Sequence, residues 1–191
     1  MALTLVTGPT TEPITVDELK EHLRIDGDDD DAYLLTCIKA ARTWFEGQTK
    51  RGIITQTWSY TVDGDWPLKY GRQWLDFPLN PVPAQTSPST VVVTYVDTDG
   101  ATQTLAETQY DLVGRLHGSY IVPAYNVEWP SVRDVPSAVS VQFVAGESSA
   151  PDDIKMALMI LAGHYYENRE TSKGAPQAVE AMVSPYRGVR F

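Results

Sequence analysis

The sequence predicts an α+β protein, in which N- and C-terminal helices form a bundle and the middle forms a β-rich antiparallel insertion. Near both ends, apolar residues recur at helical spacing, whereas in the middle they alternate at strand spacing. With 191 residues, 42% of them apolar and 21% charged, the chain fits a globular protein. The expected parts are a helical part (1–52), the β-rich insertion (53–146), helices that complete the bundle (147–184) and a tail (185–191).

Two helices are expected before residue 52. Thr15 and Glu18 form the capping-box pattern at the start of TVDELKEHLRI. In the next segment a run of aspartates occupies a helix start, where negative charge is favoured. An apolar stripe then follows at spacings of four, three and four, and Gly47 and Gly52 offer places for this helix to end; the stripe comprises Leu34, Ile38, Ala41 and Phe45.

From Ile53 onwards the apolar period is that of strands. Trp58, Tyr60 and Val62 share one face of TQTWSYTV, and the hydroxyl residues between them share the other. VVVTYVDTDGATQTL predicts a hairpin that turns at Asp99-Gly100. YDLV, SYIVP and AVSVQFVAG predict further short strands, while the proline-rich PLNPVPAQTSP excludes a central strand.

The C-terminal part returns to helix. APDDIKMALMILAGHYYENRE opens with residues suited to a first helical turn and is apolar almost all the way round, which predicts a buried central helix. APQAVEAMV predicts a short last helix, halted by Pro185. The longest strongly apolar run, MALMILAG, is far below the ~18 residues of a membrane span, and the start lacks a signal-peptide pattern. We therefore expect a soluble, cytosol-made protein with no membrane partner.

Charge and composition exclude several kinds of site. The net charge of −10 disfavours a protein that wraps nucleic acid. An EF-hand loop beginning at Asp26 would need glycine and glutamate where Asp31 and Cys37 stand, so calcium is disfavoured. We expect no metal and no cofactor. Residues 12–31 carry two cations (Lys20, Arg24) against nine acids: Glu12, Asp17, Glu18, Glu21, Asp26 and Asp28 to Asp31.

No catalytic set is predicted. Cys37 lies on an apolar helix face, where thiols are usually inert, which disfavours a nucleophile paired with His22, His117 or His164. Trp58, Trp66, Trp74 and Trp129 lie in the β-rich middle, where a sugar-binding surface is an alternative to core packing.

The segment GHYYENRE is polar and aromatic, at the end of the predicted central helix. Such an end is typical of a subunit contact or of a local hydrogen-bonded cluster. We expect it to contact a neighbouring copy head-to-tail, which can close a ring. The expected interface residues are His164, Tyr165, Tyr166, Glu167, Arg169 and Glu170.

Several segments together resemble a known family. The sequence is similar to the head–tail connector, or adaptor, proteins of long-tailed bacteriophages, prophages and phage-like gene transfer particles. The matching segments are EPITVDELKEHLRID, DDDAYLLTCIKAARTWFEGQTKRGIITQTW, PLNPVP, VTYVDTDG, LAGHYYENRE and YRGVRF.

The resemblance implies a structural protein and no enzyme. Such proteins form a ring, expected to be a dodecamer, that joins the capsid portal to tail-side connector or stopper proteins. DNA passes through the ring without specific binding. The protein is expected in the neck of a virion or phage-like particle, after synthesis in the bacterial host cytoplasm. The alternative function is that of a carbohydrate-binding or other β-rich binding module of a phage particle.

The C-terminal tail is the segment expected to fasten the adaptor to the portal. It follows the last predicted helix, is locally basic, and alternates in the manner of a docking strand. Its expected portal-binding residues are Pro185, Tyr186, Arg187, Val189, Arg190 and Phe191.

Overall fold

The computed structural model describes residues 2–63, 74–79, 90–115, 118–169 and 174–187. The chain divides into two compact units, each built from two segments. The β unit comprises Met1–Gly8 and Thr55–Gly146, and the helical unit comprises Pro9–Ile54 and Glu147–Phe191. The predicted mixture of helices and antiparallel sheets is confirmed.

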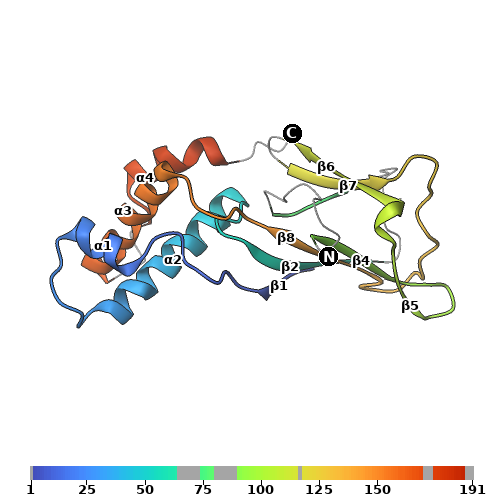
Figure 1. The fold of residues 1–191 in the computed structure, drawn as a ribbon, viewed down its shortest axis with the longest axis horizontal. Helices are drawn as coiled ribbons and strands as arrows, with labels where there is room; N and C mark the ends of the chain where they lie inside the picture. Colours follow the sequence, from blue (N-terminus) through green and yellow to red (C-terminus); the bar gives the residue numbers. More distant parts are fainter. Residues whose placement is uncertain (1, 64–73, 80–89, 116–117, 170–173, 188–191) are drawn as a thin grey trace. The chain divides into compact units, whose positions relative to one another are not determined.

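Within the described residues, the helical unit contains four α-helices (Figure 1). At the start of α1 the Thr15 side chain accepts a hydrogen bond from the Glu18 N–H, and the Glu18 carboxylate accepts one from the Thr15 N–H, so the predicted capping box is confirmed. The last helix leads into a 3₁₀ turn, η3 (Ser184–Tyr186). The helices are α1 (Val16–Leu23), α2 (Asp31–Thr49), α3 (Asp152–Asn168) and α4 (Gln177–Val183).

All four helices contribute to one apolar core. The predicted stripe of α2 is buried in it, and α3 supplies Leu158 and Leu161 from the facing side. Helix α2 does not end at Gly47. It continues to Thr49, and Lys50 caps it in the left-handed conformation. Thr49, the last residue of the helix, is buried, and its hydroxyl donates to the Phe45 carbonyl at 2.9 Å.

The described strands of the β unit form two antiparallel sheets. The larger has the order β1-β2-β8-β4-β5 and the smaller the order β3-β7-β6 (Figure 1). The larger sheet is made of β1 (Ala2–Thr7), β2 (Gln56–Val62), β8 (Val139–Ala145), β4 (Val91–Val96) and β5 (Thr102–Thr104). The smaller is made of β3 (Leu75–Asp76), β7 (Gly118–Pro123) and β6 (Tyr110–Arg115), the last preceded by η2 (Glu107–Gln109).

The two sheets share a second apolar core. The rings of Phe77 and Phe143 lie 4.8 Å apart between centroids, and the buried Tyr110 hydroxyl donates to the Val91 carbonyl at 2.7 Å. Trp58 and Tyr60 lie opposite core residues of β8, on the face that the alternation predicted. The predicted hairpin at Asp99-Gly100 is confirmed as β4–β5, with Gly100 at φ 91°.

One element differs from the sequence expectation. Residues 2–7, included in the N-terminal helical part, form β1 and pair antiparallel with β2. The strand is short and its partner lies about fifty residues later, so its stabilisation comes from tertiary pairing that a local pattern does not reveal. The predicted proline-rich segment lies mostly outside the described residues.

Candidate assembly interface

The end of α3 forms a polar and aromatic cluster with the start of α2. The Tyr166 hydroxyl donates to the Asp30 carboxylate at 2.6 Å, and its ring centroid lies 5.9 Å from that of Tyr33. The Arg169 guanidinium lies 5.6 Å from the Tyr33 ring centroid, within range of a cation–π contact. The hydrogen bond to Asp30 raises the pKa of Tyr166, because it favours the protonated phenol. The end of α3 thus makes hydrogen-bond and ring contacts within its own chain.

The remaining residues of this segment differ in exposure. The Asn168 side-chain amide donates to the His164 carbonyl at 2.8 Å and lies 3.0 Å from His164 Nδ1. Tyr165 is half-buried, whereas Glu167 and Arg169 are exposed. Glu170 lies outside the described residues.

The start of the predicted tail is attached to its own helical unit. The Tyr186 hydroxyl donates to the Asp153 carboxylate, and its ring lies 6.0 Å from that of Phe45 and 5.9 Å from the Arg51 guanidinium. The hydrogen bond to Asp153 raises the pKa of Tyr186 to about 12. These contacts hold the chain where η3 ends.

Arg187 extends the same attachment. Its guanidinium pairs with the Glu180 carboxylate and lies 3.4 Å from the Gln48 side-chain oxygen. Pro185 is exposed within η3. The other expected tail residues, Val189, Arg190 and Phe191, lie outside the described part of the chain.

Many of the acids of residues 12–31 have partners inside the helical unit. Lys20 of α1 pairs with Asp28 at 2.6 Å and with Asp31 at 2.9 Å, so these ion pairs connect α1 to the start of α2. The hydrogen bond from Lys20 lowers the pKa of Asp28. Glu18, besides capping α1, lies 3.4 Å from Lys155. Within the described residues, four exposed acids have no such partner: Asp17, Glu21, Asp26 and Asp29.

A mostly buried ion-pair network holds the two chain segments that lead to the β unit. Arg42 on α2 pairs with Glu12 at 2.8 Å and with Glu46 at 3.1 Å. The other Glu46 oxygen accepts the Ile53 N–H at 3.2 Å. The network therefore fixes both the segment that precedes α1 and the segment that follows α2.

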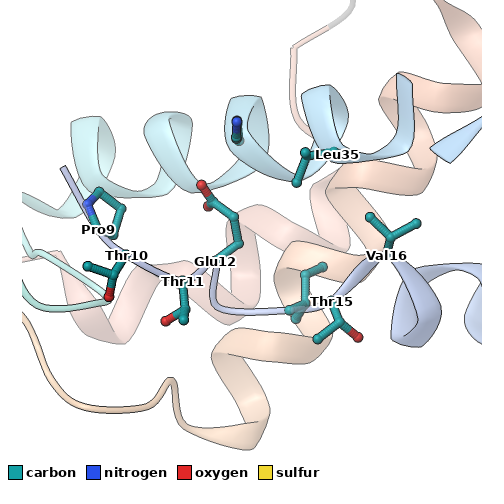
Figure 2. Close-up of a pocket in the computed structure, with 9 residues that line it drawn as sticks. Pro9, Thr10, Thr11, Glu12, Thr15, Val16 and Leu35 are labelled. Atoms are coloured by element: carbon teal, nitrogen blue, oxygen red, sulfur yellow. The ribbon is translucent and has the colours of Figure 1, made fainter. Parts of the chain in front are cut away.

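An open groove of about 440 Å³ lies along the segment that precedes α1. Figure 2 shows Glu12 directed towards α2, with Leu35 and Val16 towards one end of the groove. Lys39 is the cation in its lining, and Glu12 is already paired with Arg42. Threonines and apolar residues make up the rest, so the groove offers neither a nucleophile–base pair nor a set of metal ligands.

The other candidate sites are placed as follows. Cys37 is buried in the helical core and burial raises the pKa of its thiol, which disfavours a thiolate. Trp58 and Trp129 pack partly against the β-unit core, and Trp74 is 38% exposed. His117 and Trp66 lie outside the described residues.

The described residues contain neither a metal-site cluster nor a membrane-spanning helix. In that part of the chain, no three His, Cys, Asp or Glu side chains gather as a metal site would require. No described helix has the length and apolar character needed to cross a membrane.

Comparison with known proteins finds similarity to one protein family and to several solved structures. A family described as phage gp6-like head-tail connector protein matches residues 13–87. None of the curated protein sequences matches the chain. A chain in the neck of a native GTA particle computed with C12 symmetry is similar over 100% of this chain and 97% of its own, with 26% identity and a TM-score of 0.79.

Two further solved structures contain similar chains, each over 100% of this chain and 97% of its own. One is the neck of an empty GTA particle computed with C6 symmetry, at 26% identity and a TM-score of 0.77. The other is the virion of a native gene transfer agent (GTA) particle, at 27% identity and a TM-score of 0.76. The resemblance to head–tail connector proteins that the sequence predicts is confirmed.

Proposed function

We propose that this chain is a structural head–tail connector, or adaptor, subunit in the neck of a phage-like gene transfer particle. The observation that carries the proposal is the similarity over the whole chain to proteins of gene transfer agent necks. The connector family match supports it independently, because it rests on sequence. The chain would be made in the bacterial host cytoplasm and act in the particle.

The subunits would form a ring, proposed to be a dodecamer, that joins the portal to a tail-side connector or stopper protein. The described polar and aromatic cluster supports one contact within such a ring. Its inner members, Tyr166 and Tyr33, hold α3 to α2, while Glu167 and Arg169 remain exposed and available to a neighbouring copy. A head-to-tail contact of this kind closes a ring when the rotation closes.

DNA would pass through the ring without specific binding. The net charge of −10 and the four exposed acids of residues 12–31 that lack a described partner disfavour phosphate contacts. We expect no complex with duplex DNA in a gel-shift titration at physiological salt. A salt-dependent complex at micromolar protein would contradict this part of the proposal.

The C-terminal tail would fasten the subunit to the portal. Tyr186 and Arg187 attach the chain to the helical unit, so the docking residues are those that follow: Val189, Arg190 and Phe191. Burial of Val189 and Phe191 would each contribute ~1.5–3 kcal/mol before ordering costs. One such tail binds weakly, but identical tails of a ring act together.

Deletion of residues 188–191 tests this function. The shortened chain keeps the described Tyr186 and Arg187 contacts, so we expect it to fold normally yet fail to join portal-containing heads, as measured by co-sedimentation and particle counts. Tyr125→Ala is the matched control, because Tyr125 is an aromatic residue that is 91% exposed outside the tail. Normal joining by the shortened chain would overturn the tail proposal, and absence of the full-length chain from particle necks would overturn the function itself.

A further inference from the structure

Strand β1 is an edge of the larger sheet with an exposed outer side. It pairs with β2 on one side, and no other described strand pairs with it. In an antiparallel pair, alternate residues of an edge strand direct N–H and C=O groups away from the sheet. All six residues of β1 are exposed. The strand therefore presents a template for one more strand.

Apolar side chains extend this edge. Leu3 is 38% and Leu5 is 45% exposed, and they lie opposite Tyr60 and Trp58 of β2. The apolar face of the larger sheet thus continues onto β1. Monomeric proteins usually protect such edges with charges, prolines or bulges. Here the register shifts between Leu5 and Thr7, but residues 2–5 pair regularly and none of residues 2–7 is charged.

The opposite edge of the same sheet is also exposed and uncharged, although its side chains are polar. Strand β5 is exposed at all three residues and forms the other end of the strand order. The chain has a net charge of −10, yet residues 2–11 and 100–106 carry no charged side chain. Identical acidic copies repel one another, so uncharged edges are where two copies can approach closely.

We propose that β1 of one copy pairs with β5 of the next copy, so that the larger sheets join edge to edge around a ring. The inference rests on the proposed function, which supplies the ring. A contact between two different surfaces generates such a ring only if the rotation closes. Pairing of β1 with β1 is instead isologous and stops at a dimer. The short strands give a weak single contact, which ring closure strengthens.

Paired cysteines test this contact. The register places Thr4, opposite Ser59, and Thr104, opposite Thr94, on the same face of the larger sheet. Within one copy, β1 and β5 are four strand spacings apart, roughly 19 Å, whereas a disulfide spans Cα atoms at most about 7 Å apart. Any link between these edges formed by a short bismaleimide or by oxidation therefore joins two copies. The native Cys37 is buried and does not compete.

The experiment uses particles purified from cells that express the full chain. We expect the Thr4→Cys/Thr104→Cys variant to give a ladder of covalent multimers on a denaturing gel, and each single variant to give monomers. Thr4→Cys/Gln103→Cys is the matched control. Gln103 lies opposite Tyr95 on the other face of the sheet, so a cysteine at position 103 points away from a cysteine at position 4. If the double variant does not enter particles, co-expression of the two single variants gives the same test, with a linked dimer expected.

The outcomes separate this contact from the function. Monomers from a double variant that has entered the neck, as detected by immunoblot, would overturn the contact and leave the connector function intact. Dimers from Thr4→Cys alone would overturn it in favour of β1–β1 pairing. Absence of the wild-type chain from particles would instead overturn the connector function.

Discussion

Tyr186 holds the end of the described chain through three kinds of contact at once. Its hydroxyl donates to Asp153, its ring packs near Phe45, and Arg51 lies over its face. We expect Tyr186→Phe to keep the ring contacts and to lower the free energy of unfolding by about 1 kcal/mol, the usual contribution of one hydrogen bond. Chemical denaturation monitored by circular dichroism measures this change.

The same residue predicts a pH dependence. The pKa of Tyr186 is raised from an ordinary 10.0 to about 12, so the folded state favours the protonated phenol. This contribution to stability is full below pH 10 and is lost as the pH rises through about 12. The loss between these pH values should be smaller in Tyr186→Phe than in the wild type. Equal losses in both proteins would show that the Asp153 contact does not form in solution.

Arg42 is the cation shared by two mostly buried carboxylates. It pairs with both Glu12 and Glu46, and the three side chains are between 11% and 14% exposed. Arg42→Met leaves two mostly buried carboxylates without their cation, so we expect a loss of roughly 3 kcal/mol in the free energy of unfolding. Lys39→Met, on the same helix but exposed, is the control and should change it by less than about 0.5 kcal/mol.

A triple variant tests the reason for that loss. Glu12→Gln/Arg42→Met/Glu46→Gln removes the uncompensated charges as well as the cation, so part of the lost stability should return. If the triple variant is less stable than Arg42→Met, the network contributes through its hydrogen bonds and packing more than through its charges.

At the residue scale, local signals were predictable and distant partners were not. Thr15 and Glu18 are three residues apart, and their capping box follows from sequence alone. Tyr166 and Asp30 are 136 residues apart, and their hydrogen bond depends on how α3 packs against α2. GHYYENRE therefore revealed a cluster without revealing its partners. Likewise, nothing local to Tyr186 indicates that it contacts Asp153.

Among the elements, α1 and α3 approach one another closely at a glycine. A Cβ added to Gly163 on α3 would lie 2.8 Å from Leu23 Cδ2, at the end of α1. In Gly163→Ala, the gain in helix propensity of about 1 kcal/mol is offset by this overlap, so the net change should be small. In the Leu23→Ala background the overlap is absent, and Gly163→Ala should stabilise the protein by about 1 kcal/mol. A thermodynamic cycle of the four proteins measures the coupling.

Gly47 supplies the matched control for that cycle. It lies within α2, and a Cβ there would meet nothing within 4 Å. Gly47→Ala should therefore stabilise the protein by about 0.5–1 kcal/mol whether or not Leu23 is present. If Gly163→Ala changed the stability equally in both backgrounds, Leu23 would not be what limits the approach of α1 to α3.

The elements themselves were largely predictable, because each carries its own period. The stripe of α2 and the alternation of β2 depend only on which face is buried. Strand β1 was missed although Leu3 and Leu5 alternate with Thr4, because six residues before a glycine and a proline give a weak signal. Its pairing with β2, far along the chain, is what makes it a strand.

At the scale of the whole molecule, two apolar cores form separately in two units. The larger core lies around α2 and α3, and the other core lies between the two sheets. Each unit is assembled from two segments, so the chain passes between the units three times. An apolar core of its own is the usual condition for a unit that folds alone. The division thus raises the question of whether the helical unit needs the β unit at all.

We expect the helical unit to fold without the β unit. Where the chain leaves and re-enters it, Ile54 and Glu147 form a β-bridge, and the Glu147 N–H donates to the Ile53 carbonyl at 3.2 Å. The two ends are therefore close, and a linker of about six glycines and serines can replace residues 55–146 at a small entropic cost. A chain of residues 9–54, this linker and residues 147–191 should show helical circular dichroism and a cooperative thermal transition. Leu161→Asp in the same short chain, which places a carboxylate at a fully buried position, should abolish that transition. A short chain with no cooperative transition would mean that the helical unit depends on the β unit for its stability, despite its separate core.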